Sequence, residues 1–202
     1  MKIDNCNVYE LAESIAASGL PMLAEYEPDG FAETAGRIRG GLPSAQPHLD
    51  RACRLAAMPD GSGHRTFLSG ILVSANVTAT NVWYMQFGRY HFAQIVSSQS
   101  KMHRIRQMMA AGCNGRTIAH PKTGLPLADI HTDMEDIEKM VYNCPMGLEL
   151  TARITTNYLQ LRTIWKQRRN HKLQEWRDFC KWIETLPLAG RLIVDNRGID
   201  NA

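Results

Sequence analysis

A run of β-branched residues from Thr66 to Thr80 constrains the fold of this chain more than any other segment. The side chains of its inner part alternate partly between two sets, Ile71, Val73, Ala75 and Val77 against Leu72, Ser74, Asn76 and Thr78. Because successive side chains of a strand point to opposite faces, this pattern predicts a β-strand. We predict that a helix over 81–88 follows it directly.

Most other segments have helical character. Apolar residues spaced three to five apart predict a helix over 7–25, although Gly19 and Pro21 interrupt it. Further predicted elements are a helix that ends before Gly40, helices over 47–58 and 101–111, and a second strand over 146–156. The chain therefore mixes helices with a smaller amount of strand.

The C-terminal half contains one excursion and two further predicted helices. Residues 113–131 are rich in Gly and Pro, which predicts an irregular segment. Thr132 with Glu135 has the spacing of a capping box and predicts a helix that begins there and ends near Tyr142. Residues 157–185 are the strongest helix candidate, and we predict one long helix over them.

The composition is typical of a folded protein without an obvious charged partner. The chain has 202 residues, of which 44% are hydrophobic and 21% charged, and its formal net charge is +3. The five cysteines form no C-x-x-C pair, which predicts neither a disulfide framework nor a zinc site. No apolar run is long enough to span a bilayer, and no signal peptide is evident. We expect a cytoplasmic protein with no membrane partner and no metal.

Positive charge concentrates between residues 153 and 177, where Glu175 is the single acid. The basic residues are Arg153, Arg162, Lys166, Arg168, Arg169, Lys172 and Arg177. Tyr158, Trp165 and Trp176 interleave with them, and a nucleotide needs both stacking surfaces and guanidinium groups. A solvated helix face is the plainer interpretation of the same charge run.

Polar residues crowd the segment 89–100, which has no clean period and is predicted to be a loop. Its end, Ser97-Ser98-Gln99-Ser100, precedes the helix predicted to begin near Lys101. A serine-rich entry to a helix favours either a helix cap or a phosphate site, since free N–H groups and the positive end of the dipole meet there. Both roles can hold together.

Several common catalytic and nucleotide-binding motifs are missing from the sequence. There is no Walker loop, no dinucleotide-binding glycine fingerprint and no G-x-S-x-G elbow. His64 and His91, taken singly, are more often surface or satisfied core histidines than catalytic ones. Any catalysis by this chain would therefore need a bound cofactor.

Three segments nevertheless occur in an order that belongs to a known family. Gly63-His64-Arg65-Thr66 is followed by Gln86 and Arg89, then by Val96 to His103, and finally by Asn157 and Arg168. These segments resemble the G-H-x-T, Q-x-x-R-H-R-x-x-S-x-N-E/Q-x-S-x-R-Y and N-A-R to L-R motifs of the flavin-dependent thymidylate synthases. The resemblance covers about residues 60–185.

The resemblance implies an α+β fold with mixed helices, a small antiparallel sheet and a long C-terminal helix. It divides the chain into an N-terminal helical extension (1–60), the synthase-like domain (61–187) and a tail (188–202). It also implies a homotetramer whose flavin lies at subunit interfaces, with FAD as cofactor and NADPH and methylenetetrahydrofolate as co-substrates. The substrate would be a pyrimidine nucleoside monophosphate, and no protein cysteine would attack its base.

Site residues follow from the motif positions. The resemblance implies that the flavin is held by His64, Thr66, Arg89, His91 and Asn157. It implies that the nucleotide is held by Gln86, Ser98, Ser100, Arg104 and Arg168, with Arg168 and Gln86 in the catalytic roles.

The motifs also differ from the family's pattern. Arg89-Tyr90-His91 stands where the family has Arg-His-Arg, and Lys101 stands between Ser100 and the position of a missing phosphate-binding arginine. Arg104 or Lys101 is a candidate replacement. A lost arginine contact costs about 1.5–3 kcal/mol, so the substrate could be dCMP, or the product hydroxymethylated, rather than dUMP and dTMP.

Two other classes of function stay open on the sequence alone. A catalytically silent homologue would bind nucleotide, or less expectedly nucleic acid, through the basic segment 153–177. A structural or assembly protein would bear the resemblance by accident. Uptake of flavin by the purified protein would separate a flavin-dependent enzyme from both of these alternatives.

Overall fold

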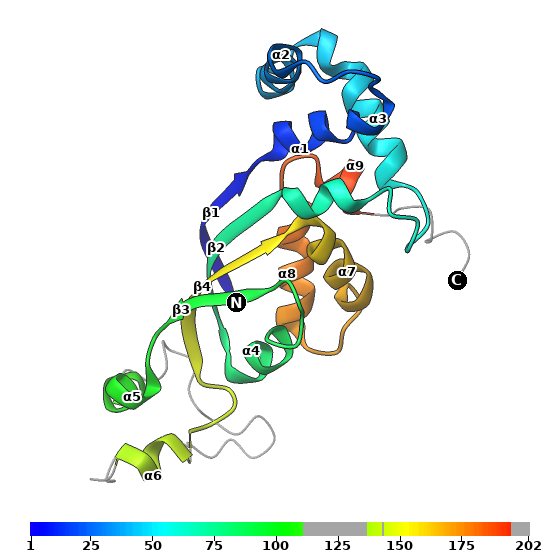
Figure 1. Ribbon diagram of the computed structural model, residues 1–202. Helices are drawn as coiled ribbons and strands as arrows, with labels where there is room; N and C mark the ends of the chain where they lie inside the picture. The colour runs from blue at the N-terminus through cyan, green and yellow to red at the C-terminus, as the bar shows by residue number, and fades with distance from the viewer. Residues whose placement is uncertain (111–136, 143, 195–202) are drawn as a thin grey trace.

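The computed structural model describes residues 1–110, 137–142 and 144–194, which combine helices with one small sheet. Helices gather beyond one end of the sheet and against one of its faces (Figure 1). The predicted α+β class with a small antiparallel sheet is confirmed. None of the helices in these described ranges is both long and apolar enough to cross a membrane.

The sheet has the strand order β1-β2-β4-β3, and every neighbouring pair is antiparallel. Its strands are β1 (Lys2–Tyr9), β2 (Leu72–Thr80), β4 (Glu149–Asn157) and β3 (Gln94–Ser98). Buried side chains alternate with half-exposed ones along β2 and β4. Val73 pairs with Thr156 and Val77 with Ala152, so the buried positions of both central strands share one face.

The helices form two groups around this sheet. Their bounds are α1 (Leu11–Ala17), α2 (Pro28–Arg39), α3 (Gln46–Ala56), α4 (Asn81–Phe87), α5 (Lys101–Ala110), α6 (Ile137–Tyr142), α7 (Tyr158–Arg168), α8 (Gln174–Glu184) and α9 (Ala189–Leu192), with 3₁₀ turns at Leu20–Met22, Pro43–Ala45 and Thr66–Gly70. Helices α4, α7 and α8 lie on the buried face of the sheet, and α1 to α3 lie beyond one end of it (Figure 1).

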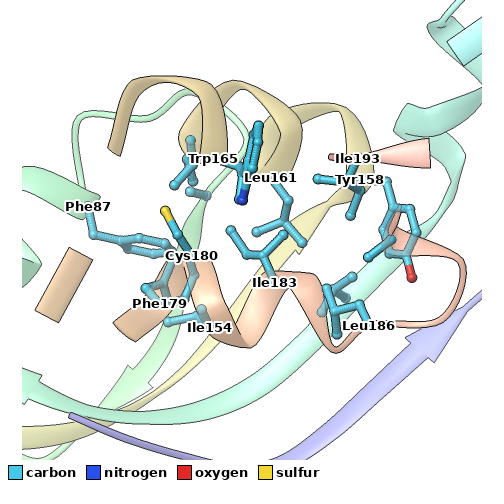
Figure 2. Close-up of a cluster of buried hydrophobic side chains, with 14 of the residues drawn as sticks. Phe87, Ile154, Tyr158, Leu161, Trp165, Phe179, Cys180, Ile183, Leu186 and Ile193 are labelled. Carbon is cyan, nitrogen blue, oxygen red and sulfur yellow. The ribbon is translucent and has the colours of Figure 1, made fainter. Parts of the chain in front are cut away.

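The core fills the space between α7, α8 and the sheet. Figure 2 shows Leu161 and Trp165 of α7 facing Phe179 and Ile183 of α8, with Ile154 of β4 beneath them. These side chains are at most 4% exposed. Fully burying one side chain of this size contributes roughly 1.5–3 kcal/mol to the stability of the fold. This packing fixes α7 and α8 against the sheet and thereby positions the residues on their outer surfaces.

Several predicted elements are confirmed within a few residues. They are the helices over 47–58, 81–88 and 101–111 and the strand over 146–156. The strand predicted over 66–80 is confirmed only from Leu72 to Thr80, because Thr66–Gly70 forms a 3₁₀ turn. The irregular segment 113–131 and the capping box at Thr132 lie outside the described residues. The described part of the next helix, α6, ends at Tyr142 as predicted.

Both edge strands differ from the predictions. The helix predicted over 7–25 is shorter, because residues 2–9 form β1 before α1 begins at Leu11. The loop predicted over 89–100 contains β3. All five residues of β3 are exposed, so no buried face imposes an alternating pattern on its sequence. Since β1 pairs with β2, residues 2–9 belong to the sheet, and the proposed domain boundary at residue 60 stays a prediction.

The long C-terminal helix predicted over 157–185 is wrong, because this stretch forms two helices. Helix α7 ends at Arg168 and α8 begins at Gln174. The turn between them is held by Arg177, whose guanidinium donates to the carbonyls of His171 and Lys172. The break lets α8 fold back against α7, and it places His171 and Trp176 beside the last turn of α7.

Candidate functional site

Four of the predicted site residues line one cavity of about 730 Å³, which we call the α4–α7 cavity. They are Gln86, Arg89, His91 and Arg168. The end of α4 and the turn after it supply one wall, and the last turns of α7 supply the other. Tyr90, Gln160, Thr163, Gln167 and His171 complete the lining. The structure thus brings together residues that are far apart in the chain.

Arg168 is the centre of this cavity's hydrogen-bond network. Its Nε donates to the Tyr90 hydroxyl over 2.7 Å, and its Nη1 donates to Oε1 of Gln86 over 3.3 Å. The guanidinium carbon also lies 4.9 Å from the ring centroid of Trp176 and 5.7 Å from that of Tyr90. Both distances are within the range of cation–π attraction. The arginine is therefore held by neutral groups.

The fold places Gln86 and Trp176 side by side through a tie at the start of α4. Thr80 caps α4, and the buried carboxylate of Glu175 accepts hydrogen bonds from the Thr80 backbone N–H (2.9 Å) and hydroxyl (2.5 Å). Trp176 is the next residue of α8, and its indole N–H donates to Oε1 of Gln86 over 2.8 Å. Glu175 therefore fixes α8 against α4 at the position where the site is built.

Three glutamine amides make this wall rich in donors. Oε1 of Gln86 accepts from Trp176, Oε1 of Gln160 accepts from the Phe92 backbone N–H (3.3 Å), and Oε1 of Gln167 accepts from the Tyr90 hydroxyl (3.1 Å). Their NH₂ groups donate to no described residue. No Asp or Glu lines the cavity. Such a wall complements a ligand with hydrogen-bond acceptors and negative charge.

His171 lies in the turn between α7 and α8 and also lines the cavity. Burial lowers the pKa of its imidazole, and the nearby charges of Arg168 and Arg177 lower it further. The ring is therefore neutral at pH 7. Its Nδ1 accepts a hydrogen bond from the Leu173 backbone N–H over 3.1 Å, which assigns the remaining proton to Nε2. This ring adds another donor to the cavity.

His64 and Thr66 line a second cavity of about 770 Å³, which we call the α1–α3 cavity. Its walls come from α1, α3 and the 3₁₀ turn at Thr66–Gly70, and they are mainly apolar. No acidic residue lines it. Arg54 is exposed there and pairs with no described residue, whereas Arg51 donates to the Ile15 and Ala16 carbonyls at the end of α1. This cavity complements an apolar ligand that carries an anionic group.

Asp60 ties the loop of His64 to the helix of Arg168. Its carboxylate forms ion pairs with Arg65, whose side chain is buried, and with Lys166 of α7 over 3.4 Å. Burial raises the pKa of Asp60, but the charges of Lys166 and Arg65 outweigh that effect and lower it. The carboxylate is therefore ionised at pH 7. Asp60 therefore links the loop at the α1–α3 cavity to helix α7 at the α4–α7 cavity.

The remaining predicted site residues line neither cavity. Asn157 is buried and caps α7, because its Oδ1 accepts from the Gln160 backbone N–H over 2.8 Å. The Ser100 hydroxyl oxygen accepts a hydrogen bond from the His103 backbone N–H over 3.4 Å at the start of α5. Ser98 is exposed on β3, and Arg104 is exposed on α5. The proposed ligand contacts of these four residues stay predictions.

Sequence reasoning missed several residues of the α4–α7 cavity. The sequence marks Tyr90 only as a departure from a motif, and no motif position indicates Gln160, Thr163, Gln167 or His171. Gln160, Thr163 and Gln167 line the cavity from α7, whereas His171 reaches it because α7 ends at Arg168 and the chain turns back. The available signal is the interleaving of Trp176 with the basic residues of 153–177, a pattern that favours a nucleotide surface.

No cysteine and no cluster of potential metal ligands occurs in the described part of either cavity. Burial raises the pKa of Cys144 and, to about 12, that of Cys180. Cys6, Cys53, Cys144 and Cys180 are free thiols. Among the described residues, no group of three or more His, Cys, Asp or Glu could hold a metal ion.

Comparison with known proteins gives a match in structure but none in sequence. No protein-family model and no curated protein matches this chain. One crystal structure of thymidylate synthase X from Helicobacter pylori, with FAD and dUMP, is similar with a TM-score of 0.67 at 13% identity, over 96% of this chain and 97% of the other. A second, of the flavin-dependent thymidylate synthase of that organism complexed with FAD and dUMP, gives 0.63 at 14% identity, over 96% and 98%. The chain therefore has the fold of these synthases over nearly its whole length.

Proposed function

We propose that this protein binds FAD and a pyrimidine deoxynucleoside monophosphate and transfers a one-carbon unit from methylenetetrahydrofolate to C5 of the base. The observation that carries the proposal is the pairing of Gln86 with Arg168 in an acid-free cavity. The shared fold supports it, since both similar structures contain FAD and dUMP. With dUMP as the default substrate, the product is dTMP.

The nucleotide half of the proposal rests on the α4–α7 cavity. Pyrimidine carbonyls and phosphate oxygens are acceptors, and this wall presents the guanidinium groups of Arg89 and Arg168 together with amide N–H groups. A hydrogen bond from a charged donor is worth about 1.5–3 kcal/mol. Gln86 and Arg168 would hold the base by two directed contacts and present its C5 to the cofactor.

The flavin half rests on both cavities. His64 and Thr66 would hold it in the α1–α3 cavity, whose apolar walls suit a ring system and whose Arg54 suits a diphosphate. Arg89 and His91 would contact it from the α4–α7 cavity, and Asn157 from the start of α7. When bound, FAD supplies hydride that it has received from NADPH.

The spread of the predicted residues supports a site that needs more than one chain. Ser98 on β3, Ser100 just before α5 and Arg104 on α5 line neither cavity of their own chain. In the proposed homotetramer they would reach the phosphate of a nucleotide bound to a neighbouring subunit. The Arg104 side chain is exposed and donates to no described residue, so its guanidinium is available for that contact.

Product analysis tests the proposed reaction. The purified protein is incubated with FAD, NADPH and methylenetetrahydrofolate, once with dUMP and once with dCMP. We expect the mass of dTMP from dUMP. A hydroxymethylated product, or conversion of dCMP alone, would keep the reaction class and change the substrate or product. No flavin uptake and no conversion of either nucleotide would refute the proposal.

The contacts of the basic side chains do not favour the alternative of nucleic-acid binding. Arg162 is buried and donates to the Leu192 and Ile193 carbonyls, while Arg169 stacks on Trp165. Arg153 donates to Asn5 and Asn76 on the sheet. These side chains are engaged within the chain rather than displayed as a surface. A steep salt dependence of DNA or RNA binding would reverse this preference.

A further inference from the structure

Arg168 is held in place without being neutralised. Its two hydrogen-bond acceptors are the phenol oxygen of Tyr90 and the amide oxygen of Gln86. No described carboxylate forms an ion pair with it. A carboxylate partner would have fixed the guanidinium equally well but would have competed with an anionic ligand. The neutral partners keep the full positive charge for whatever enters the α4–α7 cavity.

The contact with Tyr90 is directional. A guanidinium is planar, so anchoring Nε and Nη1 at once fixes its plane and the direction of Nη2. The Tyr90 hydroxyl donates its own hydrogen to Oε1 of Gln167 over 3.1 Å, which leaves its oxygen lone pairs for Arg168. Tyr90 and Trp176 also contact each other, with ring centroids 5.9 Å apart at 71°. Nη2, which has no described partner, is left for a ligand.

Tyr90 belongs to the part of the chain where the sequence departs from the family's motif. The segment Arg89-Tyr90-His91 replaces Arg-His-Arg, so a phenol occurs where the pattern has no hydroxyl. The hydrogen-bond chain from Gln167 through Tyr90 to Arg168 is therefore a property of this chain.

We propose that Tyr90 is a positioning residue, which aligns Arg168 for the nucleotide without touching it. The proposal rests on the proposed function, because it assigns a role within the same site. Removing the hydroxyl leaves the ring and the charge in place but frees the guanidinium to rotate. The ligand must then order Arg168 on binding, which weakens affinity.

The first measurement examines Arg168 in the ligand-free protein. Nitrogen-15 NMR follows solvent exchange of the Arg168 Nε–H in the wild type and in Tyr90→Phe, with Arg168→Lys used to assign the signal and Tyr26→Phe, an exposed tyrosine, as control. We expect protected exchange in the wild type and in Tyr26→Phe, and faster exchange in Tyr90→Phe. Equal exchange in the wild type and Tyr90→Phe would overturn the proposal.

The second measurement is a double-mutant cycle on dUMP affinity, determined by calorimetry on the FAD-loaded protein. Tyr90→Phe should weaken dUMP binding about tenfold, as expected when one hydrogen bond of ordinary strength is lost. In the Arg168→Lys background, where no Nε remains, the same change should alter affinity by less than about twofold. An equal loss in both backgrounds, or no loss in the wild type, would overturn the role of Tyr90.

The two proposals fail in different ways. If the wild-type protein does not bind dUMP, the proposed function is refuted, and the exchange of the Arg168 Nε–H still decides whether Tyr90 holds the guanidinium. If dUMP binds and Tyr90→Phe leaves both readouts unchanged, only the positioning role is refuted. A circular dichroism spectrum that matches the wild type shows that the variant is folded.

Discussion

At the scale of single residues, the chemistry of the candidate site comes from a few side chains whose partners are all internal. Gln86 and Arg168 were predicted from motif positions, and the structure places them in contact. Tyr90 and Gln167 could not be predicted, because hydrogen bonds between side chains 77 residues apart leave no local pattern in a sequence. A motif indicates which residues belong to a site, but the orientation of their side chains depends on neighbouring residues that only the folded structure brings close.

Replacing Arg168 tests the nucleotide site. Arg168→Lys keeps the charge but loses the planar group that Tyr90 and Gln86 hold, so we expect dUMP binding to weaken by about 1.5–3 kcal/mol. Arg169→Lys is the matched control, because Arg169 is adjacent and stacks on Trp165 outside the cavity. Calorimetry measures both. Similar losses in the two variants would mean that dUMP binds elsewhere.

His171 makes a prediction about pH. Its folded pKa lies below the ordinary value of about 6.5. The unfolded chain therefore takes up a proton before the folded one does, and the free energy of unfolding falls as pH drops below about 6.5. His171→Gln should make this fall shallower, as measured by urea unfolding between neutral and mildly acidic pH. His48, whose pKa is also lowered, keeps part of this fall in the variant, and an unchanged slope would contradict the assignment to His171.

At the scale of elements, the sequence predicts those segments that one face of the fold buries. The strands β2 and β4 and the helices α3, α4 and α5 were predicted, whereas the edge strands β1 and β3 were not. Edge strands lack a second partner and a continuous buried face, so their side chains are under less constraint. The break between α7 and α8 was missed for a different reason: the turn depends on Arg177, which returns from α8 to cap the carbonyls of His171 and Lys172.

The tie between α8 and α4 makes a prediction about stability. Thr80→Val removes the hydroxyl that donates to the buried Glu175 carboxylate, which leaves an acceptor with fewer partners. We expect a loss of about 1–3 kcal/mol in the free energy of unfolding, and weaker dUMP binding because Gln86 shifts. Thr34→Val on α2, where the hydroxyl is exposed, is the control and should change stability by less than about 0.5 kcal/mol. Equal values for the two variants would rule out the tie.

At the scale of the whole molecule, one chain holds two acid-free cavities linked through Asp60, while other predicted contacts lie on β3 and α5. The α+β fold could be predicted because the ordered motifs resemble those of the flavin-dependent thymidylate synthases, and that resemblance implies this fold. Completion of the site by a neighbouring subunit is implied by the same resemblance and stays a prediction. The proposed homotetramer would account for this arrangement.

Sedimentation velocity tests the assembly. We expect a species of four chains, each of 22.7 kDa, in the presence of FAD. If each site draws residues from neighbouring chains, Arg104→Ala should weaken dUMP binding while the tetramer persists. A monomer that binds FAD and dUMP with full affinity would contradict the interfacial site.

The central claim is that flavin and nucleotide share one site, and a titration followed by visible absorption tests it most directly. The protein is titrated with FAD in the absence and in the presence of dUMP. We expect a yellow protein whose flavin spectrum changes on addition of dUMP and whose affinity for FAD rises with dUMP bound, since coupling between two sites is reciprocal. A protein that stays colourless after FAD is added and the excess removed, or a flavin spectrum that dUMP leaves unchanged, would contradict it.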